Sequence, residues 1–155
     1  MTQDELDQIL IRAKEIAQRY RALTGRPLGI AGEIGEHEAV RLLNLTRAPV
    51  REAGFDATRR RNGREERLQI KTRCLLPKSK PGQRIGRIDL QKPWEFVLLV
   101  LLNEDFDATA IYEADRPAVE GALMEPGSKA RNERGALGVA KFRAIGRKLW
   151  PPSSI

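Results

Sequence analysis

The first quarter of the chain has the apolar spacing of an amphipathic helix. Between Leu6 and Leu23, apolar residues recur at every third or fourth position, and Gly25 with Pro27 beyond it ends the pattern. We expect this helix to serve packing or dimerisation and to have no chemistry of its own. A second helix is predicted from about Gly32 to Leu45.

A β-hairpin is predicted next. Asn62-Gly63 is the strongest short-range hairpin signal, because both central residues of a type I′ turn need positive φ. The two strands are expected over about 51–60 and 64–76. A loop rich in proline and lysine follows the second strand.

The rest of the chain continues with strands and then helices. A nearly continuous apolar run is typical of a central strand that is covered on both faces. The predicted elements are strands over 94–102 and 107–114, a short helix over 117–124, a flexible basic loop over 125–134 and a last helix over 139–149. This order predicts an α/β sandwich built on a short mixed sheet.

Composition indicates one globular domain that favours polyanions. The 155 residues suit a single domain over 1–155, and 41% of them are hydrophobic. Lys and Arg number 28 against 21 Asp and Glu, for a net charge of +7. Such a charge favours nucleic acid through phosphate neutralisation and counterion release. Many basic proteins bind no nucleic acid, so charge alone decides little.

Several classes of protein are excluded or disfavoured. The single Cys74 allows no intramolecular disulfide, and the single His37 allows no multi-histidine metal site. The acidic, polar amino terminus is wrong for a signal peptide, and the longest apolar run, 96–102, is too short to span a bilayer. We therefore expect a cytoplasmic protein without a membrane partner.

The hairpin brings an unusual set of polar groups together. If Asn62-Gly63 forms a two-residue turn, Asp56 lies directly opposite Gln69, and Lys71 points to the same face as Gln69. An acid, an amide oxygen and an ammonium group on one patch are groups from which the active site of a metal-dependent phosphodiesterase can be built. The alternative is a polar, solvated hairpin face, which is common.

The second helix places a glutamate on its apolar side. At 100° per residue, Glu36 falls between Leu43 and Val40. A carboxylate on a buried stripe is costly unless a cation, a metal or a proton satisfies it. Glu36 is also close enough to the helix start to act only as a cap. His37 falls on the polar side, where a surface position is expected.

Together, Gly35-Glu36 on a helix, Asp56 on a strand and Gln69-x-Lys71 on the next strand resemble the PD-(D/E)xK nuclease superfamily. Restriction enzymes and Holliday-junction resolvases are among its members. The match extends from about Gly32 to Tyr112. It implies a restriction-endonuclease-like α/β/α core over 32–150, with an extra amino-terminal helix over 1–25. The chain departs from the family pattern in having Phe55 in place of proline and Gln69 in place of an acid.

The resemblance implies a Mg²⁺-dependent or Mn²⁺-dependent DNA endonuclease. Asp56 would be the principal metal ligand, completed by the Gln69 side-chain oxygen and the Ile70 carbonyl, oxygen donors that suit Mg²⁺. Lys71 would orient the attacking water or help to deprotonate it. Glu36 would bind metal through water or hold a second ion. A neutral glutamine weakens cation binding, which puts rate and metal preference in doubt.

Basic residues flank the proposed site and suggest a rim that contacts phosphates, although charge runs usually form solvated faces. The candidates are Arg59, Arg60, Arg61, Arg64, Lys78, Lys80 and Arg84. DNA is the expected partner, RNA is an alternative, and a homodimer is possible. Two rival interpretations stand beside the nuclease. One is a catalytically degenerate nucleic-acid-binding or accessory protein of the same fold. The other is a basic interaction protein, in which Asp56 and Glu36 lie far apart.

Overall fold

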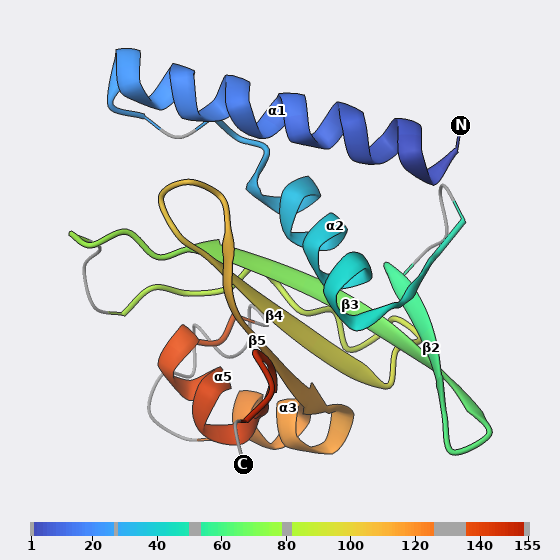
Figure 1. Cartoon of the computed structure of the whole chain (residues 1–155). Helices are drawn as coiled ribbons and strands as arrows, with labels where there is room; N and C mark the ends of the chain where they lie inside the picture. Colours follow the sequence, from blue (N-terminus) through green and yellow to red (C-terminus); the bar gives the residue numbers. More distant parts are fainter. Residues whose placement is uncertain (1, 27, 50–53, 79–81, 126–135, 154–155) are drawn as a thin grey trace.

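The computed structural model describes residues 2–26, 28–49, 54–78, 82–125 and 136–153. Its centre is a six-stranded mixed sheet with the strand order β1-β2-β3-β4-β5-β6. Helix α2 covers one face and α1 lies across α2, whereas α3 and α5 cover the opposite face (Figure 1). The predicted α/β class is therefore confirmed.

Local sequence accounts for both amino-terminal helices. Helix α1 (Gln3–Thr24) starts with a capping box in which Thr2 and Glu5 satisfy each other's backbone amides, and it ends at Gly25 in the left-handed conformation. Helix α2 (Ala31–Leu43) ends at Asn44, which is also left-handed. Helix α2 is buried on two sides, because α1 lies on one and the sheet on the other.

The hairpin has the predicted turn and register. Strands β2 (Ala57–Arg61) and β3 (Arg64–Cys74) are antiparallel, with Arg61 opposite Arg64 and every further pair in step as far as Ala57. Asn62 and Gly63 have φ of 55° and 75°, as a type I′ turn requires. The first strand is shorter than predicted, and residues 51–53 of its expected range lie outside the described residues. The prediction also missed the two-residue edge strand β1 (Thr46–Arg47).

Strand β4 (Phe96–Leu102) divides the core into two. It runs parallel to β3 and antiparallel to β5 (Ala108–Asp115). Alternate residues point to opposite faces, so Leu98 and Val100 join the cluster beneath α2, and Val97 and Leu99 join the cluster beneath α3 and α5. This double burial explains the unbroken apolar run.

The carboxyl-terminal prediction was partly wrong. Helix α3 (Arg116–Leu123) lies close to its expected place. The expected last helix is only α5 (Val139–Ile145), and Arg147–Trp150 forms strand β6 on the edge of β5. Gly146 separates the two, because a Cβ there would lie 2.7 Å from the Glu113 carbonyl oxygen. Most of the predicted basic loop lies outside the described residues. None of the described helices is long and apolar enough to cross a membrane.

Candidate functional site

Asp56 lies at the base of the hairpin, just before β2. Its backbone amide donates to the Leu68 carbonyl at 2.8 Å, and its carboxylate Oδ2 accepts from the Ile70 amide at 2.7 Å. The ladder of the hairpin ends at the Ala57–Leu68 pair, and Asp56 lies just outside it. The two bonds fix the aspartate against β3. The role of the Ile70 carbonyl as a metal ligand stays a prediction.

Gln69 is a buried amide that is only half satisfied. Its exposed fraction is 8%, and its Nε2 donates to the Gly54 carbonyl at 3.1 Å. The Oε1 atom is buried and has no hydrogen-bond partner. An unpaired buried acceptor costs about 1–3 kcal/mol, so each one in a folded protein needs an explanation.

Lys71 lies two residues further along β3. Because Leu68 and Ile70 join the cluster beneath α2, alternation places Gln69 and Lys71 on the opposite face of the sheet. Burial lowers the pKa of the Lys71 ammonium, and the Asp56 carboxylate acts in the opposite direction. Lys71 is therefore held near an anion and gives up its proton more readily than a surface lysine does.

Glu36 reaches the same electrostatic neighbourhood from α2. Gly35 allows the close packing of this helix, because a Cβ there would lie 1.9 Å from Oγ1 of Thr72 on β3. Burial raises the pKa of Glu36, the Asp56 carboxylate raises it further, and Arg47 partly offsets both. The Arg47 Nη1 is 3.8 Å from the Glu36 carboxylate. Glu36 and Asp56 therefore lie within electrostatic range of one another, whereas the basic-interaction interpretation required them to be far apart.

The donor set at the hairpin base suits a hard cation. Asp56 and the unpaired amide oxygen of Gln69 are oxygen donors of the kind that a divalent ion satisfies, and Glu36 lies within electrostatic range of Asp56 on the α2 side of the sheet. Within the described ranges, no group of three or more His, Cys, Asp and Glu side chains could hold a metal ion. A cation here would accordingly depend on Gln69 and on backbone or water oxygens to complete its ligands.

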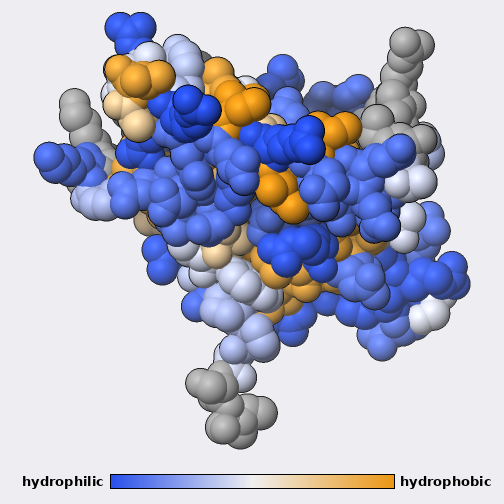
Figure 2. Space-filling view, turned by 45° about the horizontal axis from the view of Figure 1, so that its top comes forward, coloured by the Kyte–Doolittle hydropathy of each residue, from blue (hydrophilic) through white to orange (hydrophobic). Residues whose placement is uncertain are grey.

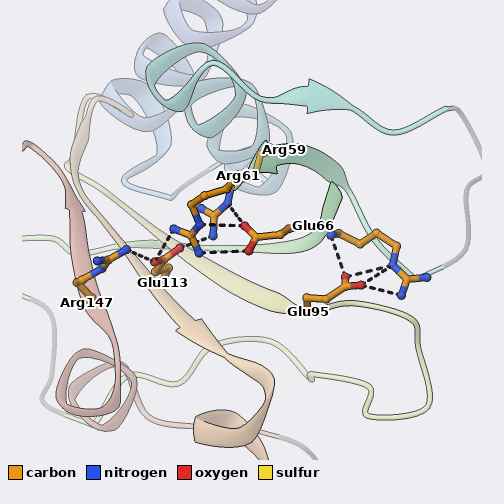
Figure 3. Close-up of polar contacts among 7 residues, drawn as sticks. Arg59, Arg61, Glu66, Glu95, Glu113 and Arg147 are labelled. Atoms are coloured by element: carbon orange, nitrogen blue, oxygen red, sulfur yellow. Dashed lines mark hydrogen bonds and ion pairs between the residues drawn. The ribbon is translucent and has the colours of Figure 1, made fainter. Parts of the chain in front are cut away.

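Arginines nearer the hairpin tip have carboxylate partners within the protein (Figure 3). Arg59 donates to Glu66 at 2.7 Å and to Glu113 at 2.6 Å, and its side chain is only 12% exposed. Arg61 contacts the same two carboxylates, and Arg147 binds Glu113 at 2.7 Å. Both hairpin guanidinium groups also lie within 5 Å of the Phe96 ring centroid. Because their guanidinium groups are paired within the protein, Arg59 and Arg61 are not among the phosphate contacts that we propose for this protein.

The other predicted phosphate contacts differ in availability. Arg60, Arg64 and Lys78 are exposed or half-exposed side chains. The Arg84 guanidinium donates to the Ala136 carbonyl at 2.8 Å, which ties it to the protein. Lys80 lies outside the described residues.

The surface position predicted for His37 was wrong. Its exposed fraction is 6%, because α1 covers the side of α2 that the helical wheel assigned to solvent. Asp7 of α1 lies 3.6 Å from Nε2, and burial lowers the pKa of the imidazole. Glu38 pairs with Arg41 at 2.7 Å. The sequence analysis also missed Arg47, which lies in the unpredicted edge strand β1. Its sequence context gave no signal beyond an isolated arginine.

Comparison with known proteins adds no family assignment: no protein-family model matches the chain, and no curated protein matches its sequence.

Proposed function

We propose that this protein is a metal-dependent DNA endonuclease that hydrolyses phosphodiester bonds at the base of the β2–β3 hairpin. The observation that carries the proposal is the unpaired, buried Oε1 of Gln69, which precedes Ile70 on β3, the residue whose amide holds the Asp56 carboxylate. A solvated polar hairpin face would have no need to bury an acceptor without a partner.

The fold is proposed to be of the restriction-endonuclease-like type. Helix α2 and the β1–β2–β3 meander follow the helix-and-strand order of that type as far as β3, and β4 lies parallel to β3, although no helix precedes β4 among the described residues. In this arrangement Asp56, the Gln69 side-chain oxygen and the Ile70 carbonyl hold Mg²⁺ or Mn²⁺, and Glu36 acts through a water or a second ion. When bound, such a cation polarises the phosphoryl oxygen and lowers the pKa of a water molecule.

The chain's own residues set up the reaction around this cation. Asp56 and Glu36 lie close enough to repel one another, which favours the binding of positive charge between them. Lys71, with its lowered pKa, orients the attacking water and exchanges a proton with it. Its ammonium form also stabilises the negative charge that develops on the phosphoryl group.

The nucleic-acid backbone is proposed to lie along exposed cations beside the hairpin. Arg60, Arg64 and Lys78 are available, and the net charge of +7 favours a polyanion in general. No described element resembles a sequence-reading motif, so we propose contacts with phosphates and make no proposal about base sequence.

Cleavage of supercoiled plasmid and branched DNA tests the proposal. Wild type should nick DNA with Mg²⁺ or Mn²⁺, and both Asp56→Asn and Lys71→Ala should slow nicking by at least about 100-fold. Glu104→Gln and Lys148→Ala alter exposed charges away from the hairpin base and should cleave at the wild-type rate.

Two outcomes would count against the enzyme. Activity that survives both site substitutions would place the chemistry elsewhere. Absence of cleavage by wild type, with salt-sensitive DNA binding intact, would favour the catalytically degenerate binder. The neutral Gln69 is the observation that favours this second function, because it leaves one formal charge fewer at the centre.

A further inference from the structure

Helix α1 leaves much of its apolar side exposed. Of its residues only Ala17 is buried, whereas Ile9, Ile16, Tyr20 and Leu23 are exposed by 54%, 60%, 39% and 84%. Apolar side chains interrupt the hydrophilic surface on the side of the molecule where α1 lies (Figure 2). Single exposed apolar residues need no explanation, but a row of them along one helix marks an interaction surface.

The helix is attached to its own domain by a different side. Lys14 pairs with Asp107, and Gln18 and Arg21 donate to backbone carbonyls of the loop between β4 and β5 at 2.9 and 3.0 Å. Ala17, the buried residue, lies on this side as well. The exposed apolar row is therefore not the side by which α1 docks on α2 and the sheet.

The spacing of the row is that of a coiled coil. Leu6, Ile9, Ala13, Ile16, Tyr20 and Leu23 are separated by 3, 4, 3, 4 and 3 residues, which is an unbroken series of a and d positions. An amphipathic helix that packs on its own domain has the same spacing, but here most of these positions are exposed, so the period keeps a seam facing outward toward a second helix. Residues at e, such as Leu10 and Ala17, fall on the flank toward the domain.

The charges of α1 point to a second copy as the other helix. Within Gln3–Thr24 four acids (Asp4, Glu5, Asp7 and Glu15) balance four bases (Arg12, Lys14, Arg19 and Arg21), although the whole chain carries +7. The amino-terminal half holds three of the acids, and the carboxyl-terminal half holds three of the bases. Two such helices complement each other only when they run in opposite directions.

We propose that this protein forms a two-fold homodimer through an antiparallel α1–α1 coiled coil. With the axis between Ala13 and Ile16, each a position meets a d position of the second copy: Leu6 with Leu23, Ile9 with Tyr20, and Ala13 with Ile16. The helix dipoles oppose one another favourably in this arrangement. The same surface serves both copies, as closed two-fold symmetry requires.

Sedimentation equilibrium of the full-length protein tests the interface. Ile16→Glu should weaken dimerisation by about 100-fold, because a buried isoleucine is lost twice and each loss is worth about tenfold. Leu23→Glu should act in the same direction. Ile11→Glu is the matched control, since Ile11 is 50% exposed but lies off the a and d row, and it should dimerise like wild type. A wild type that is monomeric at about 100 µM, or equal effects of Ile11→Glu and Ile16→Glu, would overturn the proposal.

Disulfide cross-linking in a Cys74→Ser background tests the direction of the helices. The double variant Ile9→Cys/Tyr20→Cys should form covalent dimers on mild oxidation, and Ile9→Cys alone should not. The two introduced thiols are about 16 Å apart within one helix, so they cannot pair within a chain. Efficient cross-linking of Ile9→Cys alone would indicate parallel helices and would contradict the proposal. These results do not depend on whether the hairpin base cleaves DNA.

Discussion

The two ends of the β2–β3 hairpin satisfy their polar groups differently. Near the tip, Glu113 is only 5% exposed and receives hydrogen bonds from Arg59, Arg61 and Arg147. At the base, Gln69 buries an acceptor that has no partner, and Glu36 lies within electrostatic reach of Asp56. Both ends are rich in charge, but among the described residues Glu113 near the tip is fully paired, whereas the base leaves a buried acceptor without a partner.

This difference separates a structural charge cluster from a candidate site. A network whose members are all paired gains little from a ligand and loses stability when one member is removed. A cluster left with an unpaired acceptor and repelling carboxylates is stabilised by whatever cation it binds. Substitutions at the tip should therefore change folding, and substitutions at the base should change binding and catalysis.

The largest expected effect on stability is at Glu113. Burial opposes ionisation of this carboxyl group, but hydrogen bonds from Arg59 and Arg147 prevail and lower its pKa. Glu113→Gln should lower the free energy of unfolding by about 3 kcal/mol at pH 7, because it removes the buried charge that three guanidinium groups share, although Arg59 and Arg61 keep Glu66 as a partner. A carboxyl group with a lowered pKa stabilises the fold at neutral pH and ceases to do so as the pH falls. The difference in the free energy of unfolding between Glu113→Gln and wild type should therefore shrink in acid.

Urea denaturation measures this effect. Glu120→Gln is a control, since Glu120 pairs with Arg116 in a more exposed setting and should cost less than about 1 kcal/mol. Cleavage per folded molecule should not change in either variant. An equal, small cost at both positions would remove the proposed distinction between the hairpin ends.

The next effect concerns the packing that brings Glu36 to the site. Gly35→Ala should destabilise the protein by about 1–3 kcal/mol and slow cleavage, because its Cβ would overlap Thr72 and push α2 away from β3. Gly32→Ala is the matched control on the same helix, since nothing lies within 4 Å of its Cβ position, and it should stabilise by about 0.5–1 kcal/mol. If thermal denaturation showed that both substitutions change the stability in the same direction, the close helix–strand contact would be contradicted.

A smaller effect is expected from restoring an acid at position 69. Gln69→Glu should raise the affinity for Mn²⁺ by about tenfold, which is about 1.4 kcal/mol, by adding a formal charge beside Asp56. Without metal the same variant should be less stable than wild type, because a third carboxylate joins a repelling pair. Calorimetric titration with Mn²⁺ tests the change in metal affinity, and denaturation in the presence of a chelator tests the stability without metal. A variant with unchanged metal affinity would show that the Gln69 side chain does not face the ion.

The smallest effect is the pH dependence caused by Glu36. Its pKa is raised by burial and by Asp56, so this group favours the folded state at low pH and costs stability as the pH rises through its raised pKa. Glu36→Gln should therefore gain stability relative to wild type between about pH 4 and 7, by less than about 1 kcal/mol. In saturating Mg²⁺ the wild type should be more stable than Glu36→Gln, because the wild type keeps a carboxylate for the cation.

The sequence predicted those elements of the fold that local interactions determine. The Asn62-Gly63 turn determined the hairpin register, and the unbroken apolar run identified β4 as a strand buried on both faces. Gly25 similarly marked the end of α1. Each of these features depends on residues close together in the chain.

Contacts between distant residues account for what was missed. Arg59 finds Glu113 54 residues away, so nothing near the hairpin indicated that its charge was already paired. His37 is buried only because α1 folds back over α2. Strand β6 forms because β5 offers an edge, although the sequence of Arg147–Trp150 continues a helical pattern. The proposed site was more accessible to prediction, since most of it is built within one hairpin.

Paramagnetic broadening by Mn²⁺ tests the central claim most directly. In amide NMR spectra of the full-length protein, a substoichiometric amount of Mn²⁺ should selectively broaden the signals of Asp56, Gln69 and Ile70. The broadening should disappear in Asp56→Asn and persist in Glu113→Gln. Broadening that ignores the Asp56 substitution, or that centres on another part of the chain, would contradict a cation site at the hairpin base.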